Sequence, residues 1–160
     1  MPTPTDNPLI SLCNTDELDI AAIGDALADG ADPNTIGWMR GFGYSDECTP
    51  LLAALTHRDP APTRDLVRAF IRAGAAIDQR SPRRAYSALI IAAAWNHTAI
   101  CSLLLELGAD VHAMSTDPAL GNALQACINA NAAMCLPTVE LLLAAGARVD
   151  DPGKMGDTAI

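Results

Sequence analysis

A phrase that occurs four times constrains the fold of this chain more than any other feature. It reads Gly-Ala-Asp-Pro-Asn, Gly-Ala-Ala-Ile-Asp, Gly-Ala-Asp-Val-His and Gly-Ala-Arg-Val-Asp at residues 30–34, 74–78, 108–112 and 146–150. Its glycines lie 44, 34 and 38 residues apart, and each copy follows a short apolar run such as Leu103-Leu104-Leu105. Recurrence at this spacing is typical of stacked-repeat proteins, in which neighbouring units bury the core between them.

A second phrase keeps step with the first and marks where helices begin. In each copy, Ser, Thr or Asn stands before the first apolar residue, where it caps a helix start, and the Gly of the first phrase ends a later helix in a left-handed conformation. The second and fourth units have additional Pro-containing residues between their two helices, which predict turns at 57–62 and around 131–137. The copies are Asn7-Pro8-Leu9, Thr49-Pro50-Leu51, Ser87-Ala88-Leu89, Asn122-Ala123-Leu124 and Thr158-Ala159-Ile160.

Together the two phrases resemble the ankyrin repeat, which opens on Thr-Pro-Leu-His-x-Ala, continues through two antiparallel helices and closes on Gly-Ala-Asp-x-Asn. The match is most specific between Ser87 and Gly108, whose 21-residue spacing equals the consensus, and His97 stands at the family's His position. The resemblance implies an all-α fold, an ankyrin-repeat solenoid of stacked helix-turn-helix repeats with hairpin-like loops. We expect one domain over 1–160, with repeats at about 7–34, 49–78, 87–112 and 122–150 and the start of a fifth at 158–160.

Composition agrees with helix pairs packed through small side chains. The chain has 160 residues, of which 50% are hydrophobic and only 4% aromatic, which suits one Ala/Leu-packed domain. Its first residues have no basic start and no apolar run, so we expect no secretory signal. No apolar run approaches the ~18 residues of a membrane helix. The five scattered cysteines fit reduced thiols, so we expect a cytoplasmic protein without membrane contact.

The net charge of −9 is unevenly distributed. Residues 1–48 carry −8, residues 49–86 carry +4 and residues 87–160 carry −5. Opposed potentials of this kind can steer and orient a partner, although an acidic surface can also serve solubility alone. The overall charge disfavours nucleic acid, because phosphate would be repelled.

The segments between repeats, which in ankyrin-like folds form hairpin fingers, are where the resemblance implies partner binding. They run over 35–48, 79–86, 113–121 and 151–157, and the first is twice the consensus length of seven residues. Trp, Tyr and Arg dominate binding hot spots, which favours this finger as a recognition site. The alternative is that Trp38 and Phe42 fold back over the first repeat. The first finger's candidate partner-binding residues are Trp38, Met39, Arg40, Phe42 and Tyr44.

The second finger adds Arg80, Arg83, Arg84 and Tyr86 to the candidate partner-binding residues. Arg forks suit carboxylates or phosphates, and Tyr86 is expected to stack beneath them. A solvated charge run is the other interpretation. The inner faces of the first helices, near Leu52, His57, Trp95 and Gln125, are expected to extend the surface. Arginines at 64, 68 and 72 share one helix face, which we expect to lie outside it.

Catalytic and cofactor motifs are absent from the sequence. There is no Gly-x-Ser-x-Gly, His-Glu-x-x-His, Cys-x-x-Cys or phosphate loop. We expect His97 to hydrogen-bond backbone groups at the turn between helices, His57 to be exposed and His112 to serve its turn. Two neighbouring thiols, Cys127 and Cys135, make a poor zinc site without further ligands. We therefore expect no catalytic residues, no metal site and no cofactor.

The sequence thus favours a non-catalytic module that binds another protein through its loop tips and concave face. The fold alone licenses only this class of function. Abundant Ala and nine Arg against one Lys suggest a bacterial chain. Two alternatives are an inhibitor or immunity-type protein that blocks a toxin or enzyme, and an effector adaptor that acts on a host protein. We expect a monomer, unless an oligomeric contact or further chain covers the helix around 136–145.

Overall fold

The computed structural model describes residues 8–13, 15, 18–41, 44–57, 64–131 and 135–149, with the backbone alone for 39–41, 44–46 and 131. This part of the chain is mostly helical, as the sequence predicted, and its only strands form one hairpin. The helices are α1 (Pro8–Cys13), α2 (Ile20–Ala28), α3 (Pro50–Ala54), α4 (Arg64–Arg72), α5 (Ala88–Ala94), α6 (Thr98–Glu106), α7 (Ala123–Asn131) and α8 (Leu136–Ala144). The strands are β1 (Gly37–Gly41) and β2 (Tyr44–Cys48).

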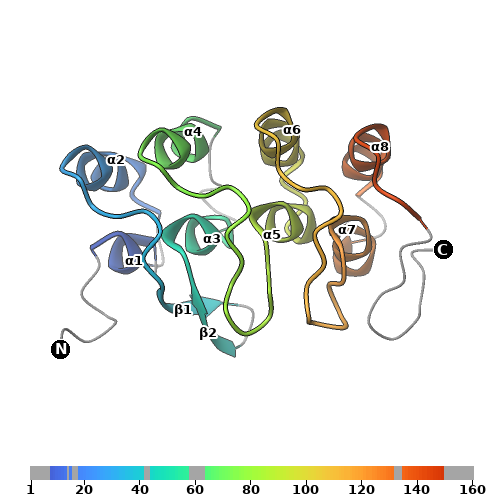
Figure 1. Ribbon diagram of the computed structural model, residues 1–160, viewed down its shortest axis with the longest axis horizontal. Helices are drawn as coiled ribbons and strands as arrows, with labels where there is room; N and C mark the ends of the chain where they lie inside the picture. Colours follow the sequence, from blue (N-terminus) through green and yellow to red (C-terminus); the bar gives the residue numbers. More distant parts are fainter. Residues whose placement is uncertain are drawn as a thin grey trace.

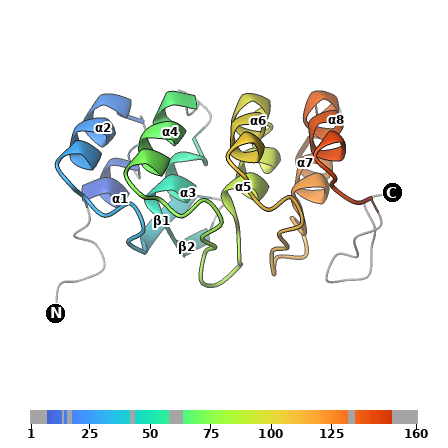
Figure 2. The ribbon, with the colours of Figure 1, turned by 45° about the horizontal axis from the view of Figure 1, so that its top comes forward.

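The helices lie in two parallel rows. Helices α1, α3, α5 and α7 form the row nearer the loops, and α2, α4, α6 and α8 form the other (Figure 1, Figure 2). Consecutive helices contact one another along both rows, and α1 with α2, α5 with α6 and α7 with α8 pack across them. The chain therefore advances one helix pair at a time, with long loops on the α1–α3–α5–α7 side.

Short polar side chains begin the helices of the loop-side row. The hydroxyl of Thr49 accepts a hydrogen bond from the amide of Leu52, and the hydroxyl of Ser87 accepts one from the amide of Ile90. At α7 the capping is reciprocal, because Asn122 Oδ1 accepts from the Gln125 amide while Gln125 Oε1 accepts from the Asn122 amide. The caps predicted at these three positions are confirmed.

Glycines end the helices of the other row. Gly30, Gly74, Gly108 and Gly146 have φ angles of 90°, 96°, 89° and 96°. A side chain at such an angle would strain the backbone, whereas Gly adopts it without steric cost. The repeated Gly-Ala phrase is therefore a helix stop, as predicted, and it turns the chain toward the next loop.

The core lies between the two rows and consists of aliphatic and small side chains. Every residue of α5 is buried, because this helix is packed against α3, α6 and α7. On α6 the buried side chains are Ile100, Cys101, Leu103 and Leu104. Small residues let helices approach closely, which explains how so few aromatics suffice.

Side chains of one helix pair also bond to the backbone of the next. Asn34 Oδ1 accepts from the amide of Ala76, and Asp78 Oδ1 accepts from the amide of Asp110, one unit further along. Nε2 of His97 bonds to the carbonyl of His57 at 3.0 Å, and Nε2 of His57 bonds to the carbonyl of Cys13 at 2.9 Å. The backbone role expected for His97 is confirmed. The exposure expected for His57 is wrong, because its ring is half-buried in this inter-pair contact.

The junction between the third and fourth helix pairs uses hydroxyl groups instead. Cys135 precedes α8 where His97 precedes α6. Thr138, fully buried on α8, donates a hydrogen bond to Asn96 Oδ1 at 2.8 Å and lies 2.6 Å from the hydroxyl of Thr98. Buried polar groups that find partners in this way fix the register of the two pairs.

Candidate functional site

The first finger is an antiparallel β-hairpin anchored at its base. Strand β1 pairs with β2 from Gly37↔Cys48 to Gly41↔Tyr44, which adds two strands to the otherwise helical described chain. Gly37 is buried against α1, where an added Cβ would lie only 2.8 Å from Ile10 Cγ1. The hairpin therefore needs glycine at this position to approach the helix so closely.

Of the five candidate residues in this finger, Trp38 is the one whose side chain the structure describes. Trp38 faces Glu47 across the hairpin, and 41% of its surface is exposed. A Trp of this exposure offers apolar area without having fully folded back over the first helix pair. The side chains of Met39, Arg40, Phe42 and Tyr44 lie outside the described residues, so their binding roles stay predictions.

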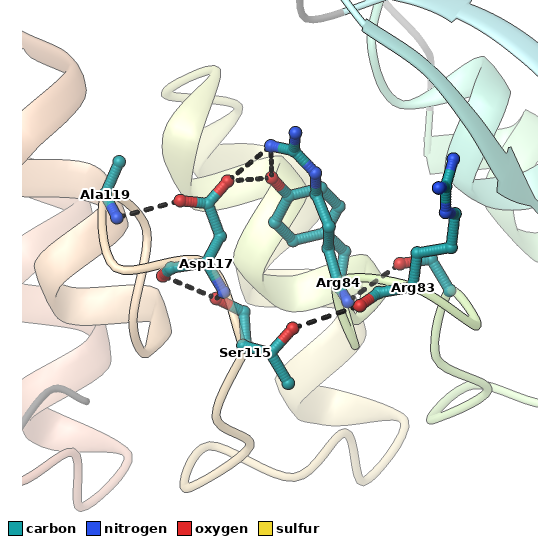
Figure 3. Close-up of polar contacts among 8 residues, drawn as sticks. Arg83, Arg84, Ser115, Asp117 and Ala119 are labelled. Atoms are coloured by element: carbon teal, nitrogen blue, oxygen red, sulfur yellow. Dashed lines mark hydrogen bonds and ion pairs between the residues drawn. The ribbon is translucent and has the colours of Figure 1, made fainter.

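The second and third fingers are joined by a cluster around Asp117. Arg84 Nη1 lies 2.7 Å from Asp117 Oδ2 and 3.2 Å from the hydroxyl of Tyr86, and that hydroxyl donates to the same Asp117 oxygen (Figure 3). The other carboxylate oxygen accepts from the amide of Ala119 at 2.9 Å. Three groups from two fingers thus meet at one carboxylate.

Backbone contacts bring the same two fingers together. The amide of Thr116 donates to the carbonyl of Arg84 at 2.7 Å, and its hydroxyl donates to the carbonyl of Arg83 at 3.1 Å. Within the third finger, the hydroxyl of Ser115 donates to the carbonyl of Asp117 at 3.1 Å. We call residues 79–86 and 113–121 the paired fingers, because these bonds hold them side by side.

The electrostatics of the cluster favour charged Asp117 and neutral Tyr86. Burial by itself would raise the pKa of Asp117, but hydrogen bonds from Tyr86, the Ala119 amide and Arg84 together lower it below its usual range. Burial, aided by the bond to Asp117, raises the pKa of Tyr86 to about 12. The hydroxyl therefore stays protonated and donates a hydrogen bond to the carboxylate throughout the physiological pH range.

The comparison with protein families matches part of this region. Residues 86–116 match the model of the ankyrin repeat family. This segment is similar to an ankyrin repeat. The resemblance inferred from the sequence is confirmed there, and the matched segment begins at Tyr86 and ends at Thr116, next to Asp117. No curated protein matches the chain.

The contacts that Tyr86 and Arg84 make with Asp117 change the roles expected for these two residues. Tyr86 is only 3% exposed, so its ring packs in the core and cannot stack beneath a partner's groups. Arg84 is committed to Asp117 and Tyr86. Asp117 was not among the predicted site residues, although it is the single acidic residue in the finger that follows the three arginines.

The remaining two arginines of the paired fingers point outward. Arg80 has 42% of its side chain exposed, lies 3.8 Å from Asp110 and donates a hydrogen bond from Nη1 to the carbonyl of Met114 in the third finger at 3.4 Å. Arg83 is exposed, and its side chain makes no hydrogen bond or ion pair within the described residues. Figure 3 shows this side chain directed away from Asp117.

The helix faces expected to extend the binding surface offer less than predicted. Leu52 is 1% exposed and Gln125 8%, because Leu52 packs in the core and Gln125 caps α7. On α4 and α6, in the other helix row, Arg64 Nη2 pairs with Glu106 Oε2 at 3.0 Å. Among the described residues, side chains that a partner could reach therefore lie in the fingers more than on the first helices.

The described residues offer few other groups of catalytic, metal-binding or membrane-spanning character. They contain no group of three or more His, Cys, Asp or Glu residues that could hold a metal ion. No helix among them is both long and apolar enough to cross a membrane. All five cysteines are buried as free thiols.

Proposed function

We propose that this chain is a single-domain solenoid of four ankyrin repeats that binds another protein and catalyses no reaction. Ankyrin repeats are generally protein–protein interaction modules, and the family is typically non-catalytic. Two stacked helix rows with a row of fingers on one side support the extension from one matched repeat to four. The finger row is the proposed binding surface.

One observation carries this proposal. In the fingers, the described side chains divide into a shielded set that joins the second finger to the third and a set exposed at the surface. Tyr86 and the largely shielded Asp117 belong to the first set, and Arg83 and the half-exposed Trp38 belong to the second; Arg80 is exposed and also bonds to the third finger. Exposed Trp and Arg on supported loops are the residue types that dominate protein interfaces.

The experiment is affinity capture from the source organism's lysate with a matched pair of variants. The site variant carries Trp38→Ala and Arg83→Ala. The control carries Leu107→Ala and Arg72→Ala, which removes one large exposed apolar side chain and one exposed arginine from the helices. Circular dichroism first establishes that both variants keep the helical content of the parent chain.

We expect a protein that the parent and the control retain and the site variant loses. Purification of that protein then separates the modes of action, because an inhibited enzyme loses its activity on binding whereas a scaffolded partner keeps it. Equal retention by the two variants, or no specific retention by the parent, counts against the proposal.

A further inference from the structure

The charges of the paired fingers leave one guanidinium uncompensated. Three arginines lie in the second finger, and two of them have acidic neighbours from the next unit: Arg84 bonds to Asp117 at 2.7 Å, and Arg80 lies 3.8 Å from Asp110. Arg83 has no such neighbour among the described residues. The positive charge left at the surface of the paired fingers is therefore centred on Arg83.

The backbone that carries Arg83 is fixed on both sides. Its carbonyl accepts the hydroxyl of Thr116, and the next carbonyl, that of Arg84, accepts the Thr116 amide. The amide of Ala85 donates to the carbonyl of Ser81, which closes the turn. An exposed arginine on a fixed backbone keeps its side-chain rotamers, and its fork can bind a planar anion in a bidentate manner without reordering of the loop.

The surroundings favour a carboxylate over a polyphosphate. The chain as a whole carries −9, so a long polyanion such as nucleic acid would be repelled over most of the surface, although residues 49–86 carry +4. A protein segment can place one or two carboxylates at Arg83 and keep its remaining surface uncharged. The first finger, with Trp38 half-exposed, lies beside the second in both ribbon views and offers the apolar neighbour that such a segment would cover (Figure 1, Figure 2).

We propose, on the basis of the protein-binding function above, that Arg83 binds an Asp or Glu side chain in an acidic segment of the partner protein. Arg80 assists, because its contacts with Asp110 at 3.8 Å and with the carbonyl of Met114 at 3.4 Å are both long and can be exchanged for the partner's carboxylate. Arg84 and Tyr86 take no direct part: they hold the second finger against the third.

The test is selection of a random-sequence displayed peptide library against the purified chain, followed by titration of synthetic versions of the enriched peptides. We expect enrichment of Asp and Glu, and affinities that fall as salt is raised. Arg83→Ala should weaken binding about tenfold, the effect of one lost charge-assisted pair, while Arg72→Ala changes it by less than about twofold. Arg83→Lys, which keeps the charge and loses the fork, should lie between them.

Several results would overturn this assignment. These are enriched peptides without acidic bias, acidic peptides whose affinity does not depend on Arg83, and the absence of any enrichment. Arg83-dependent binding of a single-stranded RNA oligonucleotide that exceeds binding of the peptides would replace the carboxylate by phosphate. A lysate partner that is lost with Trp38→Ala but kept with Arg83→Ala would preserve the proposed function and remove this inference alone.

Discussion

The hydroxyl of Tyr86 donates a hydrogen bond to the carboxylate of Asp117, a residue 31 positions later in the chain. One partner stands at the end of the second finger and the other in the third, so this bond crosses between successive helix pairs. It is mostly shielded from water, since Tyr86 is 3% exposed and the Asp117 side chain 13%. A shielded bond to a charged group contributes more to stability than an exposed one.

Replacement of Asp117 by Asn should make stability less dependent on acid. The pKa of Asp117 is lowered in the folded chain, so its contribution is present above the ordinary Asp value of about 3.9 and is lost as the pH falls through the folded value. At neutral pH we expect Asp117→Asn to cost about 1–3 kcal/mol. Urea unfolding followed from neutral to acidic pH should show this gap closing below about pH 4. A gap that stays constant with pH would show that Asp117 contributes through shape alone.

Two adjacent arginines should differ in their effect on folding. Arg84→Ala removes the ion pair and leaves the Asp117 carboxylate with fewer donors, so we expect a loss of about 1–2 kcal/mol. Arg83→Ala removes an exposed side chain without a partner in the described residues, and its effect should stay within about 0.5 kcal/mol. Denaturant midpoints of the two variants measure the difference. Equal midpoints would contradict the division of the second finger into supporting and exposed arginines.

The histidine contact between helix pairs predicts a further loss of stability. His97→Ala removes the bond from Nε2 to the His57 carbonyl and leaves a half-buried acceptor without that donor, so we expect a loss of about 1–2 kcal/mol. His97→Asn, which keeps a donor on a shorter side chain, should lose a similar amount if reach matters. Thermal unfolding by circular dichroism makes the comparison, with His112→Ala, an exposed position, as the control. A His97→Ala variant as stable as that control would contradict the role assigned to this bond.

The base of the first finger should tolerate no side chain larger than that of glycine at position 37. In Gly37→Ala the new methyl group would meet Cγ1 of Ile10 at 2.8 Å, Cγ2 at 3.0 Å and Cβ at 3.3 Å, and the β-branched Ile has few other χ1 rotamers available on a helix. We expect a loss of about 1–3 kcal/mol from this overpacking. Urea unfolding of Gly37→Ala, Ile10→Ala and the double variant checks the cause: the double variant should lose less than the two single losses together. Additive losses would show that the contact is not the source.

The cysteines should be inert until the chain unfolds. Burial raises the pKa of Cys13, Cys101 and Cys127 to about 12, which leaves very little thiolate at about pH 8. Reaction with a chromogenic disulfide reagent should therefore be slow in buffer and fast in urea. The rate in buffer then reports how often the fold opens. Rapid labelling of any of these three in buffer, located by mass spectrometry, would contradict their burial.

The parts of the structure that the sequence predicted are those that depend on neighbouring residues. The caps Thr49, Ser87 and Asn122 act on amides three residues away. The helix stop at Gly108 depends only on the positive φ angle of that residue. These signals are local, so a pattern reveals them. A recurring pattern also reveals its period, which predicted the succession of helix pairs.

The parts that it could not predict depend on residues brought together from different units. His57 was assigned to an exposed turn because its partner, the carbonyl of Cys13, lies 44 residues earlier. Tyr86 was assigned to the surface because nothing near it in sequence indicates Asp117. The sequence indicated the arginines of the second finger, but which of them remained available depended on Asp110 and Asp117 of the next unit.

The bonds between Thr116 and the carbonyls of Arg83 and Arg84 have a consequence for the thermodynamics of association. Loops that must become ordered when a partner binds lose conformational entropy, which subtracts from affinity. Here that loss has already occurred during folding, because the paired fingers constrain one another before any partner arrives. Association at Arg83 is therefore expected to resemble the docking of two preformed surfaces, with affinity limited by the quality of the contacts and not by the ordering of the loops.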